Sequence, residues 1–324
     1  MTKCSVIIPY YQHDAGILRR ALASVFAQSH AYFDIIVVDD ESPCPLEPEL
    51  AGLSVEERRR IRVVTQKNAG PGAARNAGLD AVPTDSDYVA FLDSDDDWTP
   101  DHLKIAVEHL SRFEADCYFA SIAGGAAFHY HFGVSALSNM TEITRLSDDP
   151  PIVEIPDIAS VMLRNWSFMH LSAMVIGAPL FGSTRFEATL RLAAEDVLFF
   201  YECVRNARRT ILSDAIGATR GEGVNIFHGV DSGSPLFLRQ QFNTWVALDR
   251  LETRFSHDAK DRASIASYKQ TARQQALWGQ ARLMRERKTP QLRQLAGWAW
   301  RDPHIVTSAM RLAAGKFLPR AGQR

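Results

Sequence analysis

Two periodicities of apolar residues alternate along the first two thirds of the chain. Short runs rich in branched side chains predict buried strands, whereas apolar residues three and four positions apart predict amphipathic helices. The predicted strands cover residues 5–9, 35–38, 62–65, 88–92 and 172–176, and the predicted helices lie near residues 18–25, 73–79 and 195–205. Strands and helices that alternate in this way are typical of an α/β fold with a doubly wound, mostly parallel sheet.

Polar residues at the ends of these elements add detail. Asp14 is the expected N-cap of the first helix, and Thr99 followed by Pro100 is expected to begin a further helix. Residues 128–151 are expected to be irregular. Beyond about residue 235 the pattern changes to long helical stretches, so we expect one domain over residues 1–234 and a helical C-terminal region over residues 235–324.

Composition and charge narrow the class of protein. The 324 residues are 46% hydrophobic and 23% charged, which is ordinary for a globular protein. The four cysteines form no CxxC pair, and neither a leader segment nor an apolar run that could span a membrane is evident. We therefore expect reduced thiols, no zinc site and a cytoplasmic location. Residues 251–324 contain 15 Lys and Arg against 5 Asp and Glu, which indicates either a polyanionic partner or a solvated helical surface.

The strongest chemical signal is an acidic segment at the end of the fourth predicted strand. Asp93, Asp95, Asp96 and Asp97 place four carboxylates within five positions. Such carboxylates repel one another, and their oxygens suit Mg²⁺ or Mn²⁺, which bind diphosphates through few protein ligands. The alternative is a solvated acidic turn before the next helix.

Two further polar segments follow other predicted strands. Asp39 and Asp40 follow the second strand, where an aspartate either accepts a hydrogen bond from the N3–H of uracil or forms a turn. The glycine-rich loop after the third strand has Arg75 where the third glycine of a dinucleotide-binding motif belongs, so we exclude NAD. We expect Gly70 to let a ligand approach the backbone, with Lys67 or Arg75 near phosphates. Since ligands bind at the carboxyl ends of parallel strands, these segments should share one cleft.

Together these segments resemble a known family. The motifs SVIIPYY, VVDDES, QKNAGPGAARNAGL and FLDSDDDW, in this order and spacing, are similar to those of the family 2 glycosyltransferases, which have the GT-A fold. The resemblance is specific over residues 3–115 and continues more loosely to residue 228. It implies an inverting, metal-dependent transfer of a sugar, with nucleotide-sugar binding in residues 1–120 and the acceptor side and catalytic base in residues 121–234.

The resemblance also implies roles for single residues. The implied nucleotide-sugar-binding residues are Pro9, Tyr11, Asp39, Asp40, Lys67, Gly70, Arg75, Asp93 and Ser94. The implied metal ligands are Asp95, Asp93 and His228. Glu195 and Asp196 match the family's catalytic pair, in which the aspartate is the general base, although a helix N-terminus also favours acidic residues through its dipole. Ser42 and Gln12 depart from the usual loop residues of the family.

The opening residues 5–28 also look like those of bacterial exopolysaccharide glucosyltransferases, including those of succinoglycan assembly. That likeness implies UDP-glucose as donor and a growing undecaprenyl-diphosphate oligosaccharide as acceptor. Trp278, Trp298 and Trp300 lie among basic residues, so they either contact an anionic membrane or fill the core of the C-terminal region. No nucleic acid is expected as a partner. The competing hypotheses are a sugar nucleotidyltransferase and a non-catalytic protein that binds a nucleotide sugar.

Overall fold

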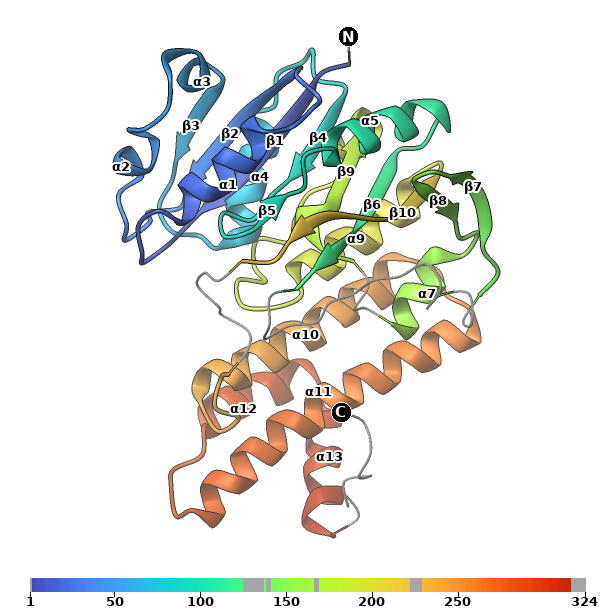
Figure 1. Ribbon diagram of the computed structural model, residues 1–324. Coiled ribbons are helices and arrows are strands. Elements are labelled where there is room, and N and C mark those ends of the chain that lie inside the picture. Colours follow the sequence, from blue (N-terminus) through green and yellow to red (C-terminus); the bar gives the residue numbers. More distant parts are fainter. Residues whose placement is uncertain (1, 125–136, 138–140, 166–168, 222–228, 316–324) are drawn as a thin grey trace. The chain divides into compact units, whose positions relative to one another are not determined.

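The computed structural model (Figure 1) describes residues 2–124, 137, 141–165, 169–221 and 229–315. The chain divides into two compact units. The first unit consists of Met1–Arg191 and Glu195–Asn225, and the second consists of Leu192–Ala194 and Ile226–Arg324. The first unit contains the sheet and the helices around it, and the second is helical.

The first unit is built on one mixed sheet. Its strands are β1 (Cys4–Tyr10), β2 (Phe33–Asp39), β3 (Ile61–Thr65), β4 (Tyr88–Phe91), β5 (Asp97–Trp98), β6 (Cys117–Ala123), β7 (Thr144–Asp148), β8 (Pro151–Glu154), β9 (Met174–Gly177) and β10 (Thr210–Thr219). They run in the order β3-β2-β1-β4-β9-β6-β10-β8-β7, and β5 pairs with β10. The β3-β2-β1-β4 portion is parallel, whereas β9 is antiparallel to both of its neighbours.

Helices cover both faces of this sheet. They are α1 (Ile17–Phe26), α2 (Leu46–Leu50), α3 (Val55–Arg59), α4 (Pro71–Asp80), α5 (His102–Arg112), α7 (Ile158–Arg164), the 3₁₀ turn η1 (Leu171–Ala173), α8 (Ala178–Phe181) and α9 (Glu195–Asn206). Val6 and Ile8 of β1 share a core with Leu22 of α1 and with α5. On the opposite face, Ile7 packs closely against α4, and Phe91 of β4 contacts Phe199 of α9. The predicted α/β, doubly wound fold is therefore confirmed.

The N-terminus of α1 is capped differently from the prediction. Asp14 is not the N-cap, because α1 begins after Gly16, which has no side chain to offer. The buried Glu49 of α2 supplies the acceptor instead, taking the N–H of Gly16 at 2.6 Å and that of Arg19 at 3.0 Å. A carboxylate at this position also suits the helix dipole. The cap comes from a residue more than thirty positions away, which local sequence cannot reveal.

Two further local predictions are wrong. The prediction that Thr99 caps a helix fails because α5 begins at His102, after Asp101, while the Thr99 hydroxyl donates to the carbonyl of Ile216 at 2.8 Å. Residues 128–151, expected to be irregular, include the strand β7, which pairs with β8. At Thr99 the deciding partner is distant in sequence, whereas β7 pairs with the next strand along the chain.

The second unit is made of long helices, as the sequence pattern predicted. They are α10 (Pro235–Arg254), α11 (Ala259–Arg285), α12 (Leu292–Arg301) and α13 (His304–Ala313). Their core contains Trp245 and Trp298 together with small and branched apolar residues. Arg273 binds the buried Asp302 through two hydrogen bonds of 2.6 and 3.0 Å, which tie α11 to the segment between α12 and α13. No helix in the described part of the chain has the length and apolar character needed to cross a bilayer.

Candidate donor and metal site

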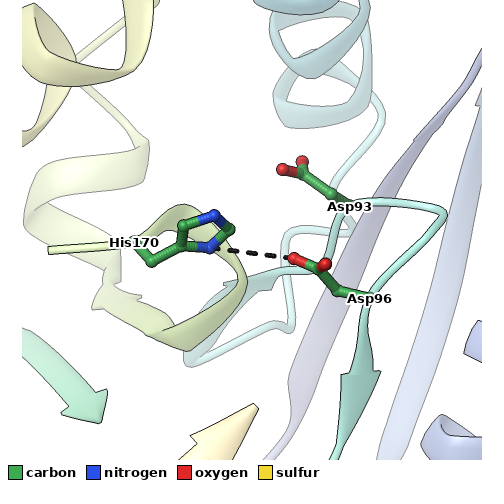
Figure 2. Close-up of side chains that lie close together, drawn as sticks. All are labelled: Asp93, Asp96 and His170. Carbon is green, nitrogen blue, oxygen red and sulfur yellow. Dashed lines mark ion pairs between the residues drawn. The ribbon is translucent and has the colours of Figure 1, made fainter. Parts of the chain in front are cut away.

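Two carboxylates and an imidazole meet where β4 ends. Asp93 and Asp96 follow β4, and His170 precedes η1, which leads into the neighbouring strand β9. One potential ligand atom from each of these side chains lies within 4.8 Å of the other two. Figure 2 shows the His170 ring turned toward Asp96, with Nδ1 at 3.7 Å from Asp96 Oδ2. Carboxylate oxygens and an imidazole nitrogen form a donor set that suits a divalent cation such as Mn²⁺ or Mg²⁺.

Ser172 of η1 positions this group. Its hydroxyl donates to Asp96 Oδ2 at 2.6 Å and accepts the N–H of Asp93 at 3.0 Å. The N–H of Ser172 in turn donates to His170 Nδ1 at 3.3 Å. The N–H of Gly221, after β10, donates to Asp96 Oδ1 at 3.0 Å. Hydrogen bonds from two separate segments, η1 and the residue after β10, therefore orient the ligand atoms, as outer partners do at metal sites.

Burial and repulsion between carboxylates shift the ionisation of the acidic segment. Burial, with the charges of Asp96 and Asp93, raises the pKa of Asp95 to about 7. Burial and Asp93 likewise raise the pKa of Asp96 to about 7. Burial opposes ionisation of Asp93 too, but the charges of Arg75 and His170 lower its pKa below the usual value. A divalent cation placed among these carboxylates would offset their mutual repulsion and favour their ionised forms.

Arg75 links the acidic segment to the start of α9. Its Nη2 donates to Asp93 Oδ1 at 2.7 Å, and its Nη1 donates to Glu195 Oε1 at 3.2 Å. Its guanidinium carbon lies 5.4 Å from the centre of the Phe186 ring. The guanidinium is buried, so these pairs are weakly screened. Arg75 was predicted near the donor, and the structure places it between the two carboxylates.

Glu195 and Asp196 begin α9 but have different surroundings. Glu195 is buried, and burial together with the charge of Asp196 raises the pKa of Glu195 to about 7. Asp196 is half-buried, and its carboxylate accepts the N–H of Val197 at 2.7 Å. Glu195 is thus buried and paired with Arg75, whereas Asp196 is the more exposed member of the pair.

Asp40 has its carboxylate occupied by the loop before α4. Gln66 Nε2 and the N–H of Ala69 donate to Asp40 Oδ1 at 2.7 and 2.9 Å, and the N–H of Gly70 donates to Oδ2 at 2.9 Å. Asp40 is also almost completely buried. Asp39 is half-buried and accepts the N–H of Ser42 at 2.9 Å. Of the two carboxylates, Asp39 accepts fewer of these hydrogen bonds and is less buried, so it is better placed to accept a hydrogen bond from a nucleobase.

A chain of hydrogen bonds joins the loops after β1, β2 and β4. The N–H of Gln12 donates to Ser42 Oγ at 2.9 Å, and Gln12 Nε2 donates to Ser94 Oγ at 3.0 Å. Gln12 and Ser94 are both buried. Gln12 and Ser42, the two residues that depart from the family pattern, are therefore used to hold the loops together. The structure brings these predicted segments to one edge of the sheet.

The other predicted donor residues border this edge. Pro9 lies half-buried in β1, Tyr11 is 37% exposed, and Lys67 is exposed. Gly70 has a φ of 91°, a left-handed conformation that favours glycine, and a Cβ there would lie 3.3 Å from the Arg191 side chain. Its positive φ turns the chain into α4.

The grouped ligand atoms differ in part from the predicted ligand set. Asp93 was predicted, whereas Asp96 and His170 were not, and Asp95 is not a member of the group. His228 lies outside the described residues. Asp96 was visible as part of the acidic run, but no motif in the sequence marks His170. Its position depends on the pairing of β9 with β4, which brings His170 to Asp93 and Asp96, 77 and 74 positions earlier in the chain.

The tryptophans of the C-terminal region were expected either to fill its core or to contact an anionic membrane. Trp298 is 2% exposed and belongs to the core of the second unit, whereas Trp278 is 39% and Trp300 89% exposed. The core therefore accounts for Trp298 and leaves Trp300 unexplained.

Comparisons with known proteins agree with this architecture. Residues 5–165 match the family described as Glycosyl transferase family 2. The chain is 61% identical to the succinoglycan biosynthesis protein ExoW of Rhizobium meliloti (strain 1021) over 98% of its own length and 99% of that protein. It is 30% identical to the amylovoran biosynthesis glycosyltransferase AmsB of Erwinia amylovora over 53% of this chain and 54% of AmsB. The crystal structure of S. aureus TarS 1-349 in complex with UDP-GlcNAc has the same fold, with a TM-score of 0.60, 19% identity, and coverage of 86% of this chain and 80% of that one.

Proposed function

The chain belongs to glycosyl transferase family 2, and on this premise we propose that it transfers a hexose, in particular glucose, from a UDP-sugar to a hydroxyl of a lipid-linked oligosaccharide. The observation that carries the proposal is the 61% identity to a succinoglycan biosynthesis protein over nearly the whole of both chains. The acceptor would accordingly be a growing exopolysaccharide unit. The amylovoran relative, from another exopolysaccharide system, supports the same class of product.

A nucleotide-sugar donor is supported by the fold and by the charge of the site. TarS, which shares the fold of this chain, has been solved in complex with UDP-GlcNAc, and this supports a donor of the same class here. In our proposal Asp39 and Tyr11 bind the nucleobase of the donor. A divalent cation is bound by Asp93, Asp96 and His170, with Asp95 close by. When bound, Mn²⁺ or Mg²⁺ supplies positive charge that stabilises the diphosphate as it leaves.

We assign proton transfer to Asp196. Its carboxylate takes the proton of the acceptor hydroxyl, and the acceptor oxygen attacks the anomeric carbon of the donor from the face opposite the nucleotide. The bond between that carbon and the diphosphate oxygen breaks, and UDP leaves with the electron pair. One displacement inverts the anomeric centre. Arg75 and Glu195 keep the start of α9 aligned with the acidic segment while this happens.

Two other proposals accompany the reaction. We propose residues 1–234 as the glycosyltransferase domain and residues 235–324 as an accessory helical region. We also propose that transfer occurs in the cytoplasm, where the four free, buried cysteines would stay reduced. The family assignment disfavours the sugar nucleotidyltransferase, whereas a non-catalytic binding protein remains an outcome of the experiment below.

The experiment is transfer to a lipid-linked acceptor in the presence of Mn²⁺. We expect a product from UDP-α-glucose whose new glycosidic bond is β, as judged by the anomeric proton coupling in the NMR spectrum. Asp196→Asn should bind donor but form little product, while Asp148→Asn, at an exposed carboxylate of β7, should behave as wild type. An α-linked product would contradict the single displacement, and UDP binding without any transfer would indicate the non-catalytic protein.

A further inference from the structure

The last two described helices leave large apolar side chains in solvent. Trp300 of α12 is 89% exposed and Leu292 is 65% exposed, while Met310 and Val306 of α13 are 65% and 44% exposed. Isolated exposed apolar residues are common on proteins, but an indole exposed to this degree is not explained by the core of the unit. These side chains therefore call for a partner outside the chain.

The exposed residues recur with helical spacing. On α12, Leu292, Ala296 and Trp300 are four positions apart and exposed, whereas Trp298 on another side of the helix packs into the core. On α13, Val306, Met310 and Ala313 are exposed, and Ile305 is buried. Because residues three and four positions apart lie on one side of a helix, each helix has an apolar stripe in addition to its core face. We call these residues of α12 and α13 the outer stripes.

The exposed charge beside the stripes is positive. From Leu292 to Ala313 the sequence contains Arg293, Arg301 and Arg311 and a single acidic residue, Asp302. Asp302 is 3% exposed and is neutralised by Arg273 through bonds of 2.6 and 3.0 Å. The wider region, residues 251–324, carries 15 basic and 5 acidic side chains. Each outer stripe thus has an exposed arginine next to it in the sequence, Arg293 and Arg301 on α12 and Arg311 on α13.

We propose that the outer stripes dock on an anionic lipid bilayer, with the helices lying in the plane of the interface. Tryptophan places its ring at the level of the headgroups, and arginines next to it are attracted by anionic lipids. The stem of an arginine can also pack on the apolar surface while its charge stays in water. A second copy of the chain is a poorer partner, because it would bring two arginine-bordered surfaces together.

The test is flotation of the full-length protein with vesicles of phosphatidylcholine alone or with one third phosphatidylglycerol. We expect binding to the anionic vesicles that weakens as salt rises, and a blue shift of tryptophan emission on binding. Trp300→Ser combined with Met310→Ser should abolish the shift. Arg293→Gln combined with Arg311→Gln should weaken binding by about 25-fold, since each arginine near the surface contributes about fivefold. Tyr32→Ser combined with Arg59→Gln, at an exposed aromatic residue and an exposed arginine of the first unit, is the matched control.

Three results would overturn the proposal. The first is equal binding to neutral and anionic vesicles, and the second is vesicle binding that the stripe variants leave unchanged. The third is that neither wild type nor the Trp300 variant binds vesicles, while light scattering shows a dimer for the wild type and a monomer for the variant. The vesicles contain no sugar acceptor, so this outcome is independent of the proposed reaction. Release of UDP from the donor without acceptor should be equal in wild type and stripe variants, which shows that the variants are folded.

Discussion

Arg75 Nη2 lies 2.7 Å from Asp93 Oδ1, which couples a helix on one face of the sheet to the carboxylate segment after β4. The other guanidinium nitrogen lies 3.2 Å from Glu195 Oε1. One side chain thereby fixes the separation between a candidate cation ligand and the helix that begins with the candidate base. A planar guanidinium can hold both carboxylates at once, whereas an ammonium is a single point charge.

We therefore expect Arg75→Lys to lower kcat by about 100-fold, because a displacement of the order of 1 Å is enough for such a loss. The KM for the donor should change much less. Steady-state kinetics of UDP release and transfer give both values. Arg185→Lys is the control, since Arg185 pairs with the exposed Asp80 at 2.9 Å and touches neither carboxylate. An equal loss in both variants would mean that the arginine-to-lysine change acts through stability alone.

Asp196→Asn should lower kcat by about 10²- to 10⁴-fold, the usual contribution of a positioned general base. The amide keeps the shape of the carboxylate and can still accept the N–H of Val197. Donor affinity, measured by calorimetry with UDP, should stay within a few-fold of wild type. If Asp196→Asn transfers sugar at the wild-type rate, another group removes the acceptor proton.

Gly78→Ala should destabilise the first unit by about 1–3 kcal/mol, the usual cost of overpacking. A Cβ at this position would lie 2.5 Å from Ile7 Cγ2, so α4 or β1 must shift. The better helix propensity of alanine offsets only about 1 kcal/mol of this cost. Gly52→Ala is the control, because a Cβ there has no atom within 4 Å. Urea unfolding should distinguish the two, and equal midpoints would show that the helix–strand contact is adaptable.

His102 should make the first unit sensitive to acid. Burial lowers the pKa of His102 from 6.5 to about 3, and neither ring nitrogen has a hydrogen-bond partner among the described residues. The folded state therefore keeps the ring neutral, while the unfolded state takes up a proton below pH 6.5. The contribution of His102 to the free energy of unfolding is therefore fully present above that pH. It decreases as the pH falls, by about 2 kcal/mol at pH 5.

His102→Phe removes this titration, so on acidification from pH 7 to pH 5 its unfolding free energy should end about 2 kcal/mol higher, relative to its own value at pH 7, than that of the wild type. The ring lies 4.9 Å from Trp98 and is close to Gly217, so some loss of stability at pH 7 is expected from packing. The slope against pH, and not the absolute value, is the measurement. His13→Phe, at an exposed histidine, should leave the slope unchanged. Parallel curves for wild type and His102→Phe would refute the assignment.

The sequence predicted the fold well where the signal is local and periodic. The four buried residues of α1, namely Leu18, Ala21, Leu22 and Val25, are those whose spacing indicated the helix. The caps were predicted poorly, because Glu49 reaches α1 from another helix. The acidic segment was found because its residues are adjacent. His170 was missed because only the pairing of β9 with β4 brings it to that segment.

The most direct test of the account is release of UDP from a panel of UDP-sugars, with Mn²⁺ or with EDTA, by wild type, Asp96→Asn and Asp148→Asn. We expect one sugar, UDP-glucose, to be hydrolysed slowly, only with Mn²⁺, and at equal rates by the wild type and the exposed Asp148→Asn variant. Asp96→Asn should release UDP at least 100-fold more slowly than the wild type, since Asp96 is one of the grouped ligands. Release that is equally fast in EDTA, or unaffected by Asp96→Asn, would contradict a donor site built on these carboxylates.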